Sequence, residues 1–174
     1  AIHERAFRES LRLLFETEGV GQPAGDPGGR TVLGISWAAH PPTRGPLERA
    51  FWQAVAAAVP NDKIKQFLVT PDAWFLSEAQ QREASRAIRD NPAVQAAAAA
   101  IYRASYWDRY RCGDLPPALG IALFDAVVNQ PATDASPDEG VIEMLQEAVG
   151  AKIDGIMGQK TVDAARNVGR GTPM

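Results

Sequence analysis

The stretch EGVGQPAGDPGGRTVLGIS, residues 18–36, decides how the chain folds. Its glycines and the run Asp26-Pro27-Gly28-Gly29 are typical of turns, and they interrupt the helical pattern on both sides. The next residues, 31–36, read TVLGIS and favour short extended segments. We therefore expect a small β-hairpin near residues 26–36 within an otherwise helical chain.

The residues before this stretch predict a helix over 2–18. Phe7, Leu11, Leu14 and Glu18 recur at steps of four, three and four, which places them on one helix face. Glycines follow directly and are expected to end the helix. Glu18 is therefore expected in the last turn, on the apolar side.

The rest of the chain predicts further helices, with Thr70-Pro71 and a capping box at Ser136–Glu139 as start signals. We expect these helices at 47–58, 61–68, 71–89, 92–110, 117–129, 136–149 and 159–167. The pattern predicts a mainly α fold with one small β-hairpin.

Composition and charge narrow the class of protein. The 174 residues are 45% hydrophobic and 22% charged, which is typical of a globular protein with one core and at most a small added module. A net charge of -3 argues against nucleic-acid binding, which usually needs a basic face. The single cysteine, Cys112, allows no internal disulfide, and we expect it to be buried.

Several kinds of site and segment are not expected. The two histidines lie apart, and no Cys/His cluster has metal-ligand spacing, so we expect neither a metal nor a cofactor. The first residues carry charge and show no signal peptide, and no apolar run is long enough to span a bilayer. We expect synthesis in a cytoplasm, with delivery by another factor if the substrate lies outside the membrane.

Glu18 has the setting of a catalytic acid. Partial burial and the negative end of the helix dipole both disfavour a carboxylate, so we expect a raised pKa for Glu18. A protonated carboxyl group in a cleft can donate its proton to a glycosidic oxygen. The alternative is a helix-end glutamate that faces solvent, as most glutamates do.

Asp26 and Thr31 supply the groups that such an acid needs. Asp26 would support positive charge on the sugar or help to activate water, and the Thr31 hydroxyl would hold that water on the far face of the ring. This arrangement suits inversion, in which the two carboxyl groups lie roughly 6.5–9.5 Å apart. The alternatives are a turn-forming aspartate and an ordinary strand threonine.

Two further groups are candidates for substrate binding. Tyr102, Tyr106 and Trp107 are expected on one helix, where they either stack on sugars or pack in the core. Asp125 and Asn129 lie four residues apart and share a helix face, where they either line the cleft or satisfy buried backbone groups.

Several blocks of sequence have an order and spacing that together resemble a known family. They are Glu18-Gly19, residues 26–31, 33–35 and 101–103, Tyr106-Trp107, residues 114–116 and 123–129, Leu145-Gln146, Asp154-Gly155, Gly158 and Thr161. With these blocks the chain resembles glycoside hydrolase family 108, which contains phage endolysins and related bacterial N-acetylmuramidases.

The resemblance implies a lysozyme-like helical fold and cleavage of the β-1,4 bond between N-acetylmuramic acid and N-acetylglucosamine. The catalytic glutamate of the family maps onto Glu18, and Gly29 falls in the signature as a substrate-binding position. It implies a muramidase domain over 1–112, in which residues 37–91 match poorly and look like an insertion. Residues 113–174 are similar to a helical peptidoglycan-binding region, which is either a separate module or packed with the domain into one unit.

The expected partners are the glycan strands of peptidoglycan, together with a holin or the proteins of a phage-like particle for delivery. The protein is expected to be a monomer that acts in the periplasm or cell wall. Two alternatives stay open at this stage. One is a lytic transglycosylase, and the other is a non-catalytic wall-binding or virion protein that kept the fold.

Overall fold

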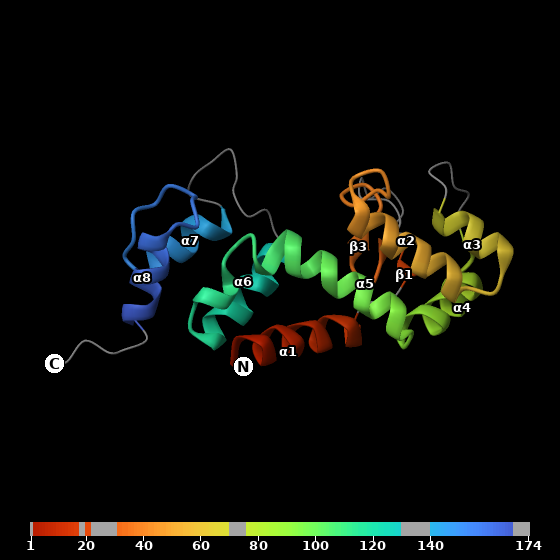
Figure 1. Cartoon of the computed structure of the whole chain (residues 1–174), viewed down its shortest axis with the longest axis horizontal. Coiled ribbons are helices and arrows are strands. Elements are labelled where there is room, and N and C mark those ends of the chain that lie inside the picture. Colours follow the sequence, from red (N-terminus) through yellow and green to blue (C-terminus); the bar gives the residue numbers. More distant parts are fainter. Residues whose placement is uncertain (1, 18–19, 22–30, 70–75, 130–139, 169–174) are drawn as a thin grey trace. The chain divides into compact units, whose positions relative to one another are not determined.

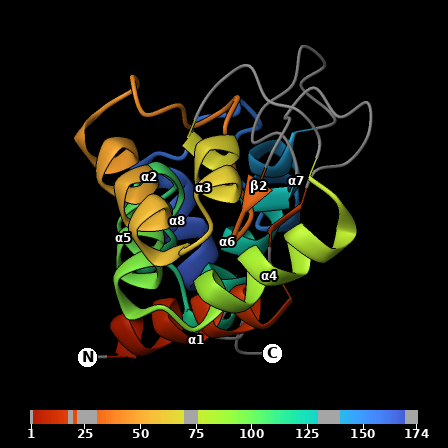
Figure 2. The ribbon, with the colours of Figure 1, turned by 90° about the vertical axis from the view of Figure 1, so that its right-hand side faces the viewer.

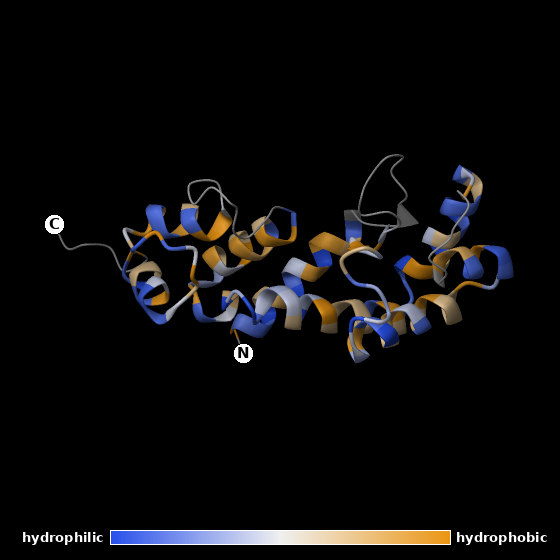
Figure 3. Ribbon diagram, turned by 90° about the horizontal axis from the view of Figure 1, so that it is seen from above, coloured by the Kyte–Doolittle hydropathy of each residue, from blue (hydrophilic) through white to orange (hydrophobic). Residues whose placement is uncertain are grey.

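The computed structural model describes residues 2–17, 20–21, 31–69, 76–129 and 140–168. Figure 1 shows a chain built mainly of helices with one small sheet. The helical ribbons in Figure 3 carry both hydrophilic and hydrophobic residues, as expected of amphipathic helices. Among the described residues, no helix is long and apolar enough to cross a membrane.

The chain divides into two compact units. We call residues 11–102 the hairpin unit, and residues 1–10 with 103–174 the C-terminal unit. One division falls inside α1 (Ile2–Thr17), and the other falls after Tyr102, at the end of α5 (Pro92–Tyr102). The sequence predicted a boundary at 112/113 between two functional regions, and that assignment stays a prediction.

The hairpin unit contains a three-stranded antiparallel sheet in the order β1-β2-β3. The strands are β1 (Val20–Gly21), β2 (Thr31–Val32) and β3 (Ile35–Ser36). Val20 pairs with Val32, Gly21 with Thr31, and Thr31 in turn with Ser36. The predicted hairpin is therefore confirmed at residues 31–36, and β1 adds a strand that the sequence did not predict.

The two-residue turn between β2 and β3 has an unusual backbone. Leu33 has φ 49° and Gly34 has φ 77°, which is the left-handed pair that tight hairpins of this kind require. Glycine adopts this conformation freely, whereas leucine does so at a cost. Leu33 is nevertheless fully buried, so packing holds it in place.

Tyr102, the last residue of α5, fixes this turn. Its ring is 1% exposed, and its hydroxyl donates a hydrogen bond of 2.8 Å to the Leu33 carbonyl oxygen. Phe15 of α1 packs near the ring, with the two ring centroids 6.3 Å apart. The buried hydroxyl thus satisfies a buried carbonyl of the turn, as a buried tyrosine requires.

Four helices complete the hairpin unit. They are α2 (Pro46–Ala58), α3 (Asp62–Val69), α4 (Glu78–Arg89) and α5. α2 contacts α3, α4 and α5, and α4 also contacts β1. Figure 2 looks onto α3 and α4 with α2 beside them.

Residues 37–91, expected to be an insertion, supply three of these helices. Their buried side chains form much of the core of the unit: Phe51, Trp52, Val55, Ile64, Phe67, Leu68, Ala84 and Ile88. The segment is therefore integral to the hairpin unit. Its predicted divergence from the family stays a prediction.

The C-terminal unit begins with the first part of α1 and continues through two short helical turns and three helices. These are the π-helix η1 (Arg103–Trp107), the 3-10 turn η2 (Cys112–Asp114), α6 (Pro117–Asn129), α7 (Val141–Ala148) and α8 (Gln159–Val168). Phe7 packs against Trp107 and Phe124, with centroids 5.2 and 6.0 Å away. A Cβ at Gly120 would lie 2.4 Å from the Cys112 carbonyl oxygen, so α6 approaches η2 closely only because this residue is glycine.

Most predicted helices are confirmed, and three boundaries were wrong. α5 ends at Tyr102 and passes into a π turn, with the Asp108 N–H bonded to the Arg103 carbonyl at 2.8 Å, so no single helix runs over 92–110. α4 begins after the Ser77 capping box, not at residue 71. α7 begins after Gly140, and the predicted caps at Thr70-Pro71 and Ser136–Glu139 lie outside the described residues.

Replacing Tyr102 with phenylalanine tests the bond to the hairpin turn. Tyr102→Phe removes the donor and leaves the buried Leu33 carbonyl unpaired, so the free energy of unfolding should fall by about 1–3 kcal/mol. Urea unfolding measures the loss, and Tyr110→Phe, on a less buried ring, is the control. Equal stability of Tyr102→Phe and the wild type would contradict the assigned role.

Candidate functional site

Helix α1 leads to the predicted acid. Phe7 and Leu11 are buried and Leu14 is half-buried, which confirms the predicted apolar face. The helix ends at Thr17, immediately before Glu18 in the sequence. Glu18 itself lies outside the described residues, so its role stays a prediction.

The segment that carries Asp26 and Gly29 is flanked by paired strands. Both residues lie outside the described part of the chain. The segment 22–30 follows Gly21 and precedes Thr31 in the sequence, and these two flanking residues are cross-strand partners. Partners in an antiparallel pair have Cα atoms about 4.5–5.5 Å apart, so Gly21 and Thr31 lie side by side.

Thr31 is the described member of the predicted catalytic trio. It is half-buried at the start of β2, between Gly21 on one side and Ser36 on the other. The strand after α1 and the strand that carries Thr31 are therefore hydrogen-bonded neighbours. This pairing joins β1, which follows Glu18 in the sequence, to β2, which follows Asp26.

Of the three aromatic candidates for sugar stacking, two are buried and one is half-buried. Tyr102 and Trp107 are buried, so neither ring has a face open for a sugar to stack on. Tyr102 anchors the hairpin turn, and Trp107 packs between Phe7 and Phe124. Tyr106 is half-buried. Tyr102 and Trp107 therefore pack in the core, which was the alternative to sugar stacking.

Asp125 and Asn129 lie on the same exposed face of α6, as their spacing predicted. The Asn129 amide donates to the Asp125 carbonyl oxygen at 2.9 Å and to its carboxylate at 3.3 Å. The two side chains therefore bond within their own helix. They belong to the C-terminal unit, whereas Thr31 belongs to the hairpin unit.

A buried cluster of ionisable side chains next to the hairpin was not predicted from the sequence. His40 is 3% exposed and Glu48 is 6% exposed, and His40 Nδ1 lies 3.2 Å from Glu48 Oε1. The Arg44 guanidinium lies 3.7 Å from the same oxygen. Burial lowers the pKa of His40, the bond to Glu48 opposes this, and the Arg44 charge adds to the lowering. The proline-rich setting of His40 predicted only a loop, although Arg44 and Glu48 have helical i, i+4 spacing.

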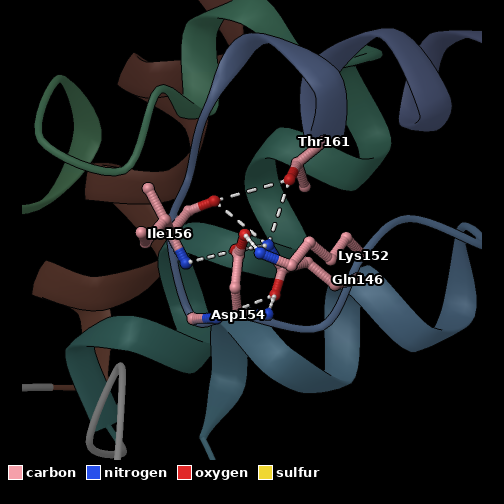
Figure 4. A network of polar contacts seen from close by, with 6 residues as sticks. Gln146, Lys152, Asp154, Ile156 and Thr161 are labelled. Carbon is pink, nitrogen blue, oxygen red and sulfur yellow. Dashed lines mark hydrogen bonds and ion pairs between the residues drawn. The ribbon is translucent and has the colours of Figure 1, made fainter.

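A second polar network organises the loop between α7 and α8 (Figure 4). The fully buried Gln146 donates to the Asp154 carboxylate, the Ile156 carbonyl and the Thr161 hydroxyl at 2.9–3.1 Å. Its side-chain oxygen accepts from the backbone N–H groups of Asp154 and Gly155 at 2.9 and 3.0 Å. Gln146 therefore holds the loop at Asp154, Gly155 and Ile156.

This loop borders a shallow depression of about 240 Å³. Its lining includes Lys152, Ile156 and Lys160, and the Ile156 side chain is 66% exposed at the rim. Lys152 lies 3.4 Å from the Asp154 carboxylate. Bonds from Gln146 and the Ile156 N–H hold the pKa of Asp154 below its usual value. The depression is thus bordered by two cations, Lys152 of the loop and Lys160 of α8, and by the apolar side chain of Ile156.

The described residues offer no group of His, Cys, Asp and Glu side chains that could hold a metal ion. Cys112 is buried, as expected, and burial raises the pKa of its thiol to about 12. A thiol with such a pKa stays protonated at neutral pH and is a poor nucleophile.

Comparison with solved structures supports the expected fold class. The protein SagA of Brucella abortus matches with a TM-score of 0.52 and 23% sequence identity, over 94% of this chain and 70% of its own. At this identity the likeness shows a shared fold. The expected mainly helical, lysozyme-like fold with a small β-hairpin is confirmed. No curated protein matches the chain.

The family follows from residues 11–130, which match Glycosyl hydrolase 108. This range is well over half of the chain, so the chain belongs to glycosyl hydrolase family 108. It is accordingly a glycoside hydrolase, and its family indicates a muramidase-type enzyme that degrades peptidoglycan. The matched range includes the segment 37–91 and the positions of the predicted catalytic trio.

Replacing Gln146 tests the organisation of the loop in the C-terminal unit. Gln146→Leu keeps the side-chain bulk but leaves the N–H groups of Asp154 and Gly155 without their acceptor, so we expect a loss of about 2–4 kcal/mol in unfolding free energy. The control is Gln159→Leu, because Gln159 is exposed. Urea unfolding measures both, and equal losses in the two variants would contradict the assigned role.

Proposed function

We propose that the protein is an N-acetylmuramidase that hydrolyses the β-1,4 bond between N-acetylmuramic acid and N-acetylglucosamine. The observation that carries the proposal is the family match over residues 11–130, which covers the last part of α1, the whole sheet and α5. The arrangement of the strands supports it, because β1 begins two residues after Glu18 and pairs with the strand of Thr31.

In the proposed reaction, Glu18 donates its proton to the glycosidic oxygen as the bond from that oxygen to the sugar C1 breaks. Asp26 stabilises the positive charge that develops on the sugar ring. A water molecule held by the Thr31 hydroxyl attacks C1 from the opposite face and loses a proton, with Asp26 as the base. Asp26 then releases its proton to solvent and Glu18 takes one up, which restores the enzyme for the next cycle.

The position of Thr31 suits this role. Its strand is paired on both sides, so the backbone at this residue is held between two neighbours. A hydroxyl on a rigid strand positions a water molecule better than one on a free loop. Attack by water on the far face predicts inversion at C1.

The C-terminal unit is proposed to hold the enzyme on the wall. The depression beside the loop of Gln146 carries Lys152 and Lys160, and the stem peptides of peptidoglycan carry carboxylates. Opposite charges and the exposed Ile156 side chain favour contact with such a polymer. Asp125, Asn129 and Tyr106 stay proposals as further sugar contacts.

The biological setting is proposed to be lysis or penetration of a host wall by a phage or phage-like particle. Delivery would come from a holin or from proteins of the particle, and the enzyme would act as a monomer in the periplasm or cell wall. The reaction needs no cofactor, because carboxyl groups and water supply all of its steps.

The central prediction concerns Glu18. Glu18→Gln keeps the size of the side chain but removes its proton-donating group, so the release of reducing sugars from purified peptidoglycan should fall by about 10²–10⁴-fold. The matched control is Glu16→Gln, since Glu16 is exposed on α1 and pairs with Arg12. Thermal unfolding shows whether both variants stay folded.

Two results would contradict the proposal. Full activity in a folded Glu18→Gln variant would exclude this residue as the acid. Binding of the wild type to peptidoglycan without release of any sugar fragment would favour a non-catalytic wall protein instead.

A further inference from the structure

His40 and Glu48 form a buried pair of ionisable side chains that the proposed reaction does not use. Buried ionisable side chains are rare unless they are paired, because their removal from water is costly. Here the carboxylate only accepts, so His40 Nδ1 carries the proton of the 3.2 Å bond. Arg44, whose Nε lies 3.7 Å from the same oxygen, provides the compensating charge.

The backbone of His40 connects the end of the sheet to α2. Its N–H donates to the Ser36 carbonyl oxygen at 2.9 Å, and its own carbonyl oxygen accepts from Trp52 Nε1 at 2.7 Å. The Ala39 N–H donates to the Ser36 hydroxyl at 3.1 Å, and the Arg44 guanidinium donates to the Ala39 carbonyl. The turn after β3 is therefore tied to α2 through both the side chain and the backbone of His40.

Two of these hydrogen bonds are made to Ser36, which lies beside Thr31 in the sheet. Ser36 is the cross-strand partner of Thr31, and the turn holds both its carbonyl and its hydroxyl. A shift of His40 would move Ser36 and, through the strand pairing, Thr31. Space for the cluster is tight, because a Cβ at Gly45 would lie 3.1 Å from Glu48 Oε2.

We propose that His40 is a positioning residue for Thr31, and that Glu48 and Arg44 hold it in that role. The inference rests on the proposed function, because it assigns a reason for the precise placement of a water-holding hydroxyl. His40 acts through Ser36 and touches no reacting atom. Because Thr31 is proposed to hold the attacking water and not the sugar, a shift of Thr31 should affect the rate of the bound complex more than its formation.

Paired substitutions separate positioning from mere packing. In His40→Asn the amide nitrogen takes the place of Nδ1, whereas His40→Gln puts its amide nitrogen at the place of Nε2 and cannot restore the bond to Glu48. Glu48→Gln keeps an acceptor oxygen, whereas Glu48→Ala removes it. Ile64→Val, in the buried part of α3, is the control for a general loss of stability in the same unit.

The measurement is the steady-state cleavage of soluble peptidoglycan fragments by each full-length variant, with thermal unfolding alongside. We expect kcat to fall by about tenfold to a hundredfold in His40→Gln and Glu48→Ala, with KM unchanged within about twofold. His40→Asn and Glu48→Gln should recover most of kcat, and Ile64→Val should keep it.

The outcomes are distinct from those that test the proposed function. If the wild type releases no sugar, the proposed function fails whatever the variants do. If the wild type is active and the two disruptive variants keep its kcat, the positioning role is wrong. The same conclusion follows if kcat falls in Ile64→Val as much as in His40→Gln, or if the conservative variants recover nothing. Should one disruptive variant not fold, the other gives the decisive comparison.

Discussion

The hydrogen bond from the Tyr102 hydroxyl to the Leu33 carbonyl is the constraint on which the hairpin unit depends. It joins the end of α5 to a turn whose leucine has an unfavourable left-handed backbone at φ 49°. Local preference alone would not keep leucine there, since such a conformation is costly for a residue with a branched side chain. Burial of Leu33 and the bond from Tyr102 together offset that cost.

The turn at Leu33 determines where β2, the strand that carries Thr31, lies. β2 begins at Thr31 and leads straight into the turn, so fixing Leu33 fixes the register of the hairpin. A slip of one residue would move Val32 and Ile35 out of the core, and both are buried. The strand is thus held at its turn by Tyr102 and at its other end by pairing with Gly21.

Periodicity and turn chemistry were sufficient to predict the helices, the hairpin and the apolar face of α1, because these depend on local sequence. The π turn at Arg103–Trp107 was not predictable, since the helical pattern continues through it and tertiary packing of Trp107 decides the outcome. The role of Tyr102 was ambiguous for a related reason, because a tyrosine that stacks on a sugar and one that packs in the core look alike in sequence.

The cluster around His40 was missed because its partner, Glu48, lies on another element. Thr31 is the one predicted catalytic residue that the structure describes, and the roles of Glu18, Asp26 and Thr31 stay predictions.

We propose that this member of glycosyl hydrolase family 108 cleaves peptidoglycan with water as the nucleophile. The most direct measurement is digestion of purified peptidoglycan in water enriched in heavy oxygen, followed by mass spectrometry of the released muropeptides. Hydrolysis predicts one heavy oxygen at each new reducing end, on N-acetylmuramic acid. Unlabelled products with anhydro-muramic ends would contradict the account, because the sugar's own hydroxyl would then have replaced water, as in a lytic transglycosylase.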